Sequence, residues 1–124
     1  MITFEILLRA LFSIFFVVAG ITHFTHASIY DSLVPTYLPN PRFFHLISGF
    51  FEIFLGLSLL TRWKSTGAMF LALFLAIVYL GNLHMWINDI PFLGNNLSTS
   101  AHVLRLIAQI FMILYALYIW RTFK

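Results

Sequence analysis

The sequence predicts an all-α fold, a bundle of four transmembrane helices with both termini in the cytoplasm. Of the 124 residues, 61% are hydrophobic and only 9% are charged. Soluble domains carry roughly 25% charged residues, so the solvent for most side chains must be lipid. Four apolar segments are also long enough to cross a hydrocarbon core of about 30 Å. We expect one domain over residues 1–124, with spans at 3–24, 43–61, 66–87 and 102–120.

The first span is an anchor rather than a signal peptide, because the basic n-region is missing and Glu5 comes first. In the segment that follows, residues 25–41, Pro35, Pro39 and Pro41 forbid a continuous helix. This segment is nevertheless too apolar for a free aqueous loop, and it contains tyrosine, which is favoured at the headgroup level. We expect it to lie in the membrane interface and to cover the mouth of the bundle.

The second span carries a glutamate, Glu52, in its middle. At helical rise Glu52 is about 15 Å from either edge of the bilayer, where an ionised side chain costs several kcal/mol. The same helical face carries small and polar residues at three- and four-residue spacing: His45, Ser48, Gly49 and Gly56. Its small residues predict a close approach by another helix. Glu52 has either a packing role, satisfied by neighbouring helices, or a functional one.

The third span has no charged residue, and its polar side chains gather at its far end, at Asn82 and His84. These two residues are about 200° apart on a helix, so we expect only one of them to face inward. Turn residues follow at 88–100. The fourth span places His102, Arg105 and Gln109 on one face.

Basic residues set the orientation. The turn between spans two and three and the C-terminus hold Arg62, Lys64, Arg121 and Lys124, whereas the two longer loops hold none. By the positive-inside rule both termini are cytoplasmic, and we expect an integral protein of the bacterial inner membrane. The basic residues form no patch or stripe, so nucleic acid is not an expected partner.

Polar residues collect in the outer half of the predicted bundle, which indicates a polar pocket open toward the outer face. The candidate ligand-binding residues are His23, His45, Ser48, Glu52, Asn82, His84, Arg105 and Gln109. Arg105 is the expected electrostatic partner of Glu52, directly or through Gln109 and water. Two interpretations stay open: the residues bind the polar head of a membrane-soluble ligand such as a quinone, or they form an inter-helix network that only fixes the bundle.

Other chemistries fit less well. Bis-histidine haem would need two histidines at matching level, such as His23 with His45 or His84, and nothing in the spacing enforces that arrangement. Tight histidine–carboxylate spacing such as HExxH is absent, so no metal site is expected. No cysteine is present, which excludes thiol chemistry by this chain. The sequence holds no self-sufficient catalytic constellation, and whether the protein is an enzyme stays open, as does its cofactor, for which a quinone is the candidate.

Five motifs occur in order: Gly20-Ile-Thr-His23-Phe24, Val34-Pro35-x-x-Leu38-Pro39-x-Pro41, Ser48-Gly49-x-x-Glu52, Asn82-x-His84-Met85 and Leu104-Arg105-x-x-x-Gln109. Together they resemble the DoxX-like family of small membrane proteins over nearly the whole chain. The resemblance implies a four-helix membrane bundle. One archaeal branch of that family supplies the membrane subunit of a thiosulfate:quinone oxidoreductase, and some animal relatives act as receptor-assembly chaperones.

The resemblance therefore leaves two functions open. One is an accessory or ligand-binding subunit of a membrane complex, which holds a quinone- or lipid-like molecule and associates with the bilayer and with a partner subunit or further copies of itself. The other is a structural or chaperone-like assembly protein. Because this chain has no thiol, any sulfur chemistry would need a partner subunit.

Overall fold

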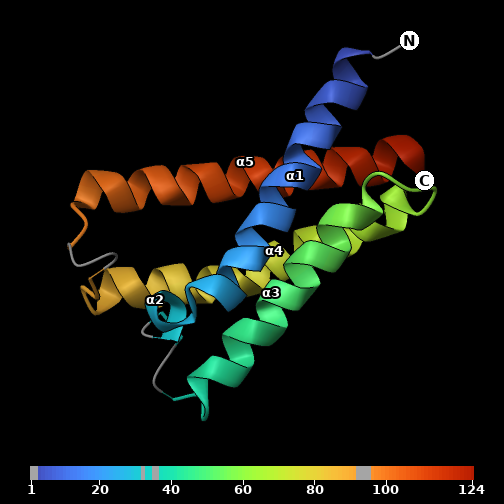
Figure 1. Ribbon diagram of the computed structural model, residues 1–124. Coiled ribbons are helices and arrows are strands. Elements are labelled where there is room, and N and C mark those ends of the chain that lie inside the picture. Colours follow the sequence, from blue (N-terminus) through green and yellow to red (C-terminus); the bar gives the residue numbers. More distant parts are fainter. Residues whose placement is uncertain (1–2, 32, 35–36, 92–95) are drawn as a thin grey trace.

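The computed structural model describes residues 3–31, 33–34, 37–91 and 96–124. In this part of the chain the regular elements are all helices, shown in Figure 1: α1 (Phe4–Thr25), α2 (Ala27–Asp31), α3 (Pro41–Ser58), α4 (Lys64–Ile87) and α5 (Thr99–Phe123). The predicted all-α class is confirmed. Pro35, which contributed to the predicted break before α3, lies outside the described residues.

Capping residues explain where the helices begin. The Thr3 hydroxyl accepts a hydrogen bond from the Ile6 amide at 3.2 Å, which fixes the start of α1. The Ser98 hydroxyl accepts one from the Ala101 amide at 3.2 Å, so α5 begins earlier than the predicted span at 102. Proline occupies the first position of α3, where its missing N–H costs nothing.

Three helices, α1, α4 and α5, are long and apolar enough to cross a membrane, and they mark the chain as an integral membrane protein. Helix α3 has 18 residues and is not one of the three. It contains Arg42, His45 and Glu52 and ends at Ser58 rather than at the predicted residue 61. The fold is thus helical and membrane-spanning as predicted, with three of the four predicted spans among the helices that are long and apolar enough to cross.

The long helices form two antiparallel pairs. In the first pair the Ser13 hydroxyl of α1 donates to the Gly56 carbonyl of α3 at 2.6 Å. In the second the Ser65 hydroxyl of α4 donates to the Trp120 carbonyl of α5 at 2.8 Å. The α1/α3 pair is inclined to the α4/α5 pair in the view of Figure 1. The short connection between α3 and α4 therefore lies near the C-terminus, and α2 lies at the opposite end.

Glycines let α1 and α3 touch at backbone distance. A Cβ atom added at Gly49 would lie 2.6 Å from the His23 Cβ atom, and one added at Gly20 would lie 2.6 Å from the Gly49 carbonyl oxygen. Real side chains do not tolerate such distances, so the helices could not pack this closely without glycine. The predicted close approach at Gly49 is confirmed. It sets the position of His23 beside α3.

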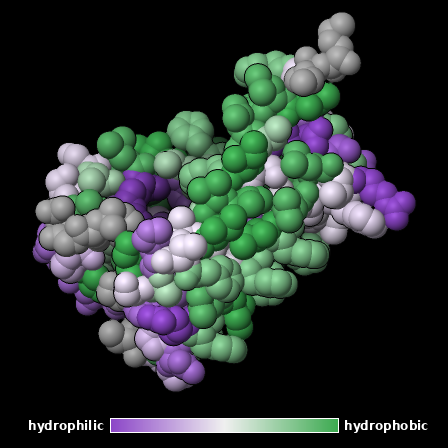
Figure 2. Space-filling view, viewed as in Figure 1, coloured by the Kyte–Doolittle hydropathy of each residue, from purple (hydrophilic) through white to green (hydrophobic). Residues whose placement is uncertain are grey.

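A compact apolar cluster closes the end of the molecule that holds the α3–α4 connection. All four long helices contribute to it, through the buried residues Phe16, Leu55, Leu59, Ala68, Leu71, Leu75 and Ile119. Large hydrophobic side chains such as Phe4 and Phe111 remain exposed on the outside, and Figure 2 shows hydrophobic residues over much of the visible surface. An outer surface of this kind is expected of helices that face lipid. The opposite end of the molecule is hollow.

Candidate functional site

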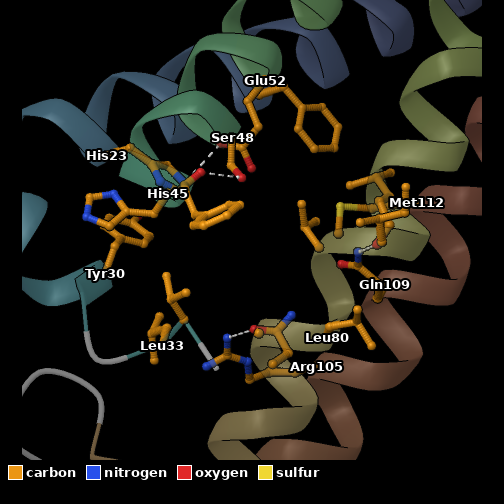
Figure 3. Close-up of a pocket in the computed structure, with 18 of the residues that line it drawn as sticks. His23, Tyr30, Leu33, His45, Ser48, Glu52, Leu80, Arg105, Gln109 and Met112 are labelled. Atoms are coloured by element: carbon orange, nitrogen blue, oxygen red, sulfur yellow. Dashed lines mark hydrogen bonds and ion pairs between the residues drawn. The ribbon is translucent and has the colours of Figure 1, made fainter. Parts of the chain in front are cut away.

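A cavity of about 500 Å³ lies between the two helix pairs, toward the end that carries α2 (Figure 3). Most of its lining is apolar or aromatic, for example Phe15, Leu80 and Met112. Leu33, Val34, Tyr37 and Leu38, which follow α2, also line it. A large apolar cavity with a few polar groups is the usual form of a small-molecule site. Residues after α2 thus cover part of the cavity, as the sequence predicted for the 25–41 segment.

The cavity brings together seven of the eight candidate residues: His23, His45, Ser48, Glu52, Asn82, Arg105 and Gln109. His84 is not among the residues that line it. Its Nδ1 atom lies 3.0 Å from the side-chain nitrogen of Asn88, the residue that follows α4. The sequence predicted that only one of Asn82 and His84 faces inward. Asn82 is the one that faces the cavity, and His84 does not line it.

On the α4/α5 side of the cavity the polar groups are bound to one another or to the backbone. The Arg105 guanidinium donates to the Asn82 side-chain oxygen and also contacts the Met85 sulfur at 3.8 Å. The Gln109 amide donates to the Leu75 carbonyl at 2.6 Å and is buried. These hydrogen bonds join α4 to α5 and hold the side chains in fixed positions.

The predicted direct pair between Glu52 and Arg105 does not form. Figure 3 shows the two side chains on opposite sides of the cavity. Glu52 instead faces His23, with 3.3 Å between Glu52 Oε2 and His23 Nε2. The reason is the pairing of the helices: Arg105 meets Asn82 on its antiparallel neighbour α4, whereas Glu52 meets α1 across the glycine contact.

Helix α2 supplies groups that the sequence analysis did not select. The Tyr30 ring stacks on His23, with 4.0 Å between ring centres, and its hydroxyl lies 2.7 Å from the Thr22 hydroxyl. Asp31 accepts two hydrogen bonds from Arg42, at 2.7 and 3.1 Å, and one from His45 Nε2 at 2.6 Å. One signal was present in the sequence, since Asp31 is the only acidic residue of the 25–41 segment.

The hydrogen bonds to Asp31 fix its charge. Arg42 above all, and His45 to a smaller degree, lower the pKa of Asp31 from 3.8 to about 2, against the opposing effect of burial. The carboxylate is therefore ionised at neutral pH and can only accept hydrogen bonds. It follows that His45 carries its proton on Nε2 in this contact, and that its other ring nitrogen, Nδ1, can accept a proton.

Several buried polar atoms at this site have no hydrogen-bond partner among the described residues: His23 Nδ1, His45 Nδ1 and Glu52 Oε2. The two histidine rings lie side by side, 5.7 Å apart between centres. Buried polar atoms without partners are rare, and each calls for a ligand, an ordered water molecule or a functional role. Within the described residues no group of three or more histidine and acidic side chains has the arrangement of a metal site.

The fold and the cavity define the class: an integral membrane protein of helices with a ligand-sized cavity between two helix pairs. Residues 12–120 match a family described as a domain of unknown function, DUF8561, and the chain belongs to that family. No curated protein and no solved structure matches the chain significantly. The cavity and its lining are therefore the features of this chain that bear on its function.

Proposed function

We propose that this protein crosses the bacterial inner membrane four times, with both termini in the cytoplasm, and holds a quinone-like or lipid-like molecule in its cavity. In this proposal it is an accessory or ligand-binding subunit of a membrane complex. The observation that carries it is the cavity of about 500 Å³, apolar over most of its lining, whose wall also includes Glu52, His23 and Arg105.

The contacts of α3 with α1 support a fourth crossing. From Ser13 with Gly56 to Gly20 with Gly49, α3 runs beside α1 at backbone distance. If α1 crosses the bilayer, then α3 shares its depth. With 18 residues α3 is about 27 Å long, close to the thickness of a hydrocarbon core of about 30 Å. Its polar residues His45 and Glu52 face the cavity or α1 rather than lipid.

The basic turn at Arg62 and Lys64 supports the cytoplasmic placement of the termini. Reporter fusions test it: a fusion at Asn95 and one after Lys124 should report opposite sides of the membrane. If both fusions report the same side, the four-span topology is wrong.

The chemistry of the lining supports the ligand class. Pockets for drug-sized ligands typically measure about 300–1,000 Å³ and have a mainly apolar wall with a few placed polar groups. Glu52 and His23 on one side and Arg105 on the other can bind two polar groups of one head, while the apolar lining accepts a ring or chain. A quinone has two oxygens at opposite ends of its ring, and a lipid head also carries separate polar groups.

The resemblance of five motifs to the DoxX-like family supports the same proposal, since that family includes a subunit of a quinone-linked enzyme. These motifs include His23, Glu52, Asn82, Arg105 and Gln109, all of which line the cavity. Under this proposal the chain works with a partner subunit or as a homo-oligomer, and any redox chemistry belongs to the complex.

A cavity-filling substitution tests ligand binding without removing a polar group. Ala108 lines the cavity, so Ala108→Phe should occupy its volume. Ala76, an exposed α4 residue that is not among those lining the cavity, provides the matched control Ala76→Phe. Mass spectrometry of extracts from the purified proteins should find a quinone or lipid in the wild type and in Ala76→Phe, and much less in Ala108→Phe. Equal amounts in all three proteins would contradict the proposal.

One observation favours the alternative, a structural or chaperone-like assembly protein whose polar residues only fix the bundle. Gln109, Asn82 and Asp31 each have partners within the chain, which is what a structural network requires. In that case no small molecule copurifies in proportion to the protein. Substitutions of these residues would then lower stability and change nothing else.

A further inference from the structure

Four titratable side chains form a series from the surface at α2 to the cavity: Asp31, His45, His23 and Glu52. Their exposure falls abruptly after the first. The side chain of Asp31 is 35% exposed, that of His45 3%, that of His23 11% and that of Glu52 13%. The first member therefore meets the outside, whereas the other three line the cavity. No part of the proposed function requires Asp31 or the contact between the histidines.

The outer half of the series is a carboxylate–imidazole pair. Asp31 Oδ1 accepts from His45 Nε2 at 2.6 Å, and Arg42 holds the same carboxylate through two hydrogen bonds. An ionised carboxylate in this position accepts the Nε2–H of His45. Histidine is the side chain that gains and loses a proton near neutral pH.

The inner half is a second, looser carboxylate–imidazole contact. His23 Nε2 lies 3.3 Å from Glu52 Oε2, and this contact is not a hydrogen bond in the described structure. The Tyr30 ring stacks on His23, and its centre lies 5.8 Å from the centre of the His45 ring. Tyr30 therefore covers both histidines on the α2 side. The charged and titratable groups that face the two histidines are thus Asp31 and Tyr30 from α2 and Arg42 and Glu52 from α3.

Each histidine of the series has one ring nitrogen that takes part in none of these contacts. His45 Nδ1 and His23 Nδ1 are both buried and have no hydrogen-bond partner among the described residues. Their rings are neighbours, 5.7 Å apart between centres. In a purely structural network, leaving both nitrogens without a hydrogen bond would destabilise the fold for no gain. A role in proton transfer explains why they are kept.

We propose that Asp31, His45, His23 and Glu52 form a proton-transfer path from the aqueous surface at α2 to Glu52 in the cavity. A proton that reaches the Asp31 carboxylate passes to His45 Nε2 when His45 holds its own proton on Nδ1. The Nδ1 proton of His45 then passes to His23 Nδ1, and His23 releases its Nε2 proton to the Glu52 carboxylate. His45 is left in the Nε2–H form that faces Asp31. Only N–H and O–H bonds form and break, and one proton moves for each one taken up. Tautomer exchange of the two rings restores the starting state.

Among the described residues, the α4/α5 side of the cavity has no comparable series of titratable groups. There the groups are the Arg105 guanidinium, which does not lose its proton in proteins, and the amides of Asn82 and Gln109. The ligand class that follows is a head that takes up or releases protons at an oxygen, as a quinol does, oriented with that oxygen at Glu52. This part of the inference rests on the proposed function, whereas the path itself does not.

Proton exchange at the histidines tests the path without any added ligand. The chain has five histidines, so each ring can be followed by ¹⁵N NMR of histidine-labelled protein in lipid nanodiscs and assigned with single His→Gln variants. His102 is an internal control: it is buried like His23 but stacks on Trp86, away from the series. In the wild type the ring N–H of His23 should exchange with water faster than that of His102.

Two variants interrupt the outer half of the path, the nearly isosteric Asp31→Asn and His45→Gln. In both we expect the His23 exchange rate to fall to that of His102, although Asp31 does not touch His23, while the His102 rate stays unchanged. Wild-type exchange of His23 in His45→Gln would mean that protons enter through the cavity, and would overturn the path. So would slow exchange of His23 in the wild type.

The quinone or lipid content of the same samples separates this inference from the proposed function. Fast, Asp31-dependent exchange without any copurifying molecule would support the path and contradict ligand binding. A copurifying molecule with Asp31-independent exchange would do the reverse.

Discussion

The two helix pairs use their polar residues differently. In the α4/α5 pair, the Arg105–Asn82 and Gln109–Leu75 hydrogen bonds tie one helix to the other. In the α1/α3 pair, glycines and the Ser13–Gly56 hydrogen bond make the helix contact, and among the described residues His23 and Glu52 keep atoms without a hydrogen-bond partner at the cavity. Where glycines supply most of the close packing, some polar side chains are not needed to join the helices. In the proposals made above, His23 and Glu52 of the α1/α3 pair contact the ligand and carry the proton.

Separating α1 from α3 should have the largest effect. In Gly49→Leu the new side chain begins 2.6 Å from the His23 Cβ atom and 2.9 Å from the Gly20 carbonyl oxygen. We expect the free energy of unfolding in mixed micelles to fall by about 3 kcal/mol, the upper part of the usual range for overpacking.

Gly81→Ala is the control for Gly49, because an added Cβ atom there would meet only the Leu33 carbonyl, at 3.3 Å. Its stability should stay close to that of the wild type, since the better helix propensity of alanine offsets the tighter contact. A Gly49→Leu protein as stable as Gly81→Ala would mean that glycine contacts do not hold the α1/α3 pair.

Asn82→Leu tests the hydrogen bonds that join α4 to α5. It removes the acceptor of the Arg105 guanidinium, and leaving a buried charged donor short of its acceptor costs about 1–3 kcal/mol. Replacing both partners, in Asn82→Leu with Arg105→Met, should recover part of that loss, because no buried charge then remains. A double variant less stable than the sum of both single losses would show that these residues do more than join α4 to α5.

Much of this fold follows from the sequence, because length and hydropathy determine which segments are helical and apolar. The predicted spans 3–24 and 66–87 agree with α1 and α4 to within two residues at each end. The polar face of α3 was also readable from its three- and four-residue spacing. The inclination between the helix pairs (Figure 1) could not be predicted from the sequence, because it depends on how side chains of distant segments pack.

The same limit applies to the site. Spacing along a helix predicts that Asn82 and His84 face different ways, but it does not say which helix lies opposite. Arg105 was expected to meet Glu52 because both are charged, yet it meets Asn82, which its antiparallel neighbour places nearer. Asp31 was missed because its partners, Arg42 and His45, are brought to it only by the turn between α2 and α3.

A smaller effect should appear at low pH. The pKa of Asp31 is lowered in the folded protein to about 2 from 3.8, so its contribution to stability is present above about pH 4 and is lost as the pH falls through about 2. Asp31 is partly exposed, and its contribution is therefore modest.

We expect the thermal midpoint of the wild type to fall between pH 4 and pH 2 more than that of Asp31→Asn, which lacks this group. The two midpoints should differ most at the upper end of this range. Parallel pH profiles would show that the Asp31 contacts with Arg42 and His45 do not stabilise the folded state.

The most direct test of ligand binding by the α1/α3 side is a paired measurement on Glu52→Gln: thermal stability in detergent, and copurifying quinone or lipid per mole of protein. Glutamine is nearly isosteric and removes a buried charge, so stability should change little, while ligand retention should be lost, as in His23→Ala and Asn82→Ala. Glu5→Gln, whose carboxylate pairs with Arg9 outside the cavity, should retain the ligand. Wild-type retention in Glu52→Gln, His23→Ala and Asn82→Ala alike would contradict ligand binding in this cavity.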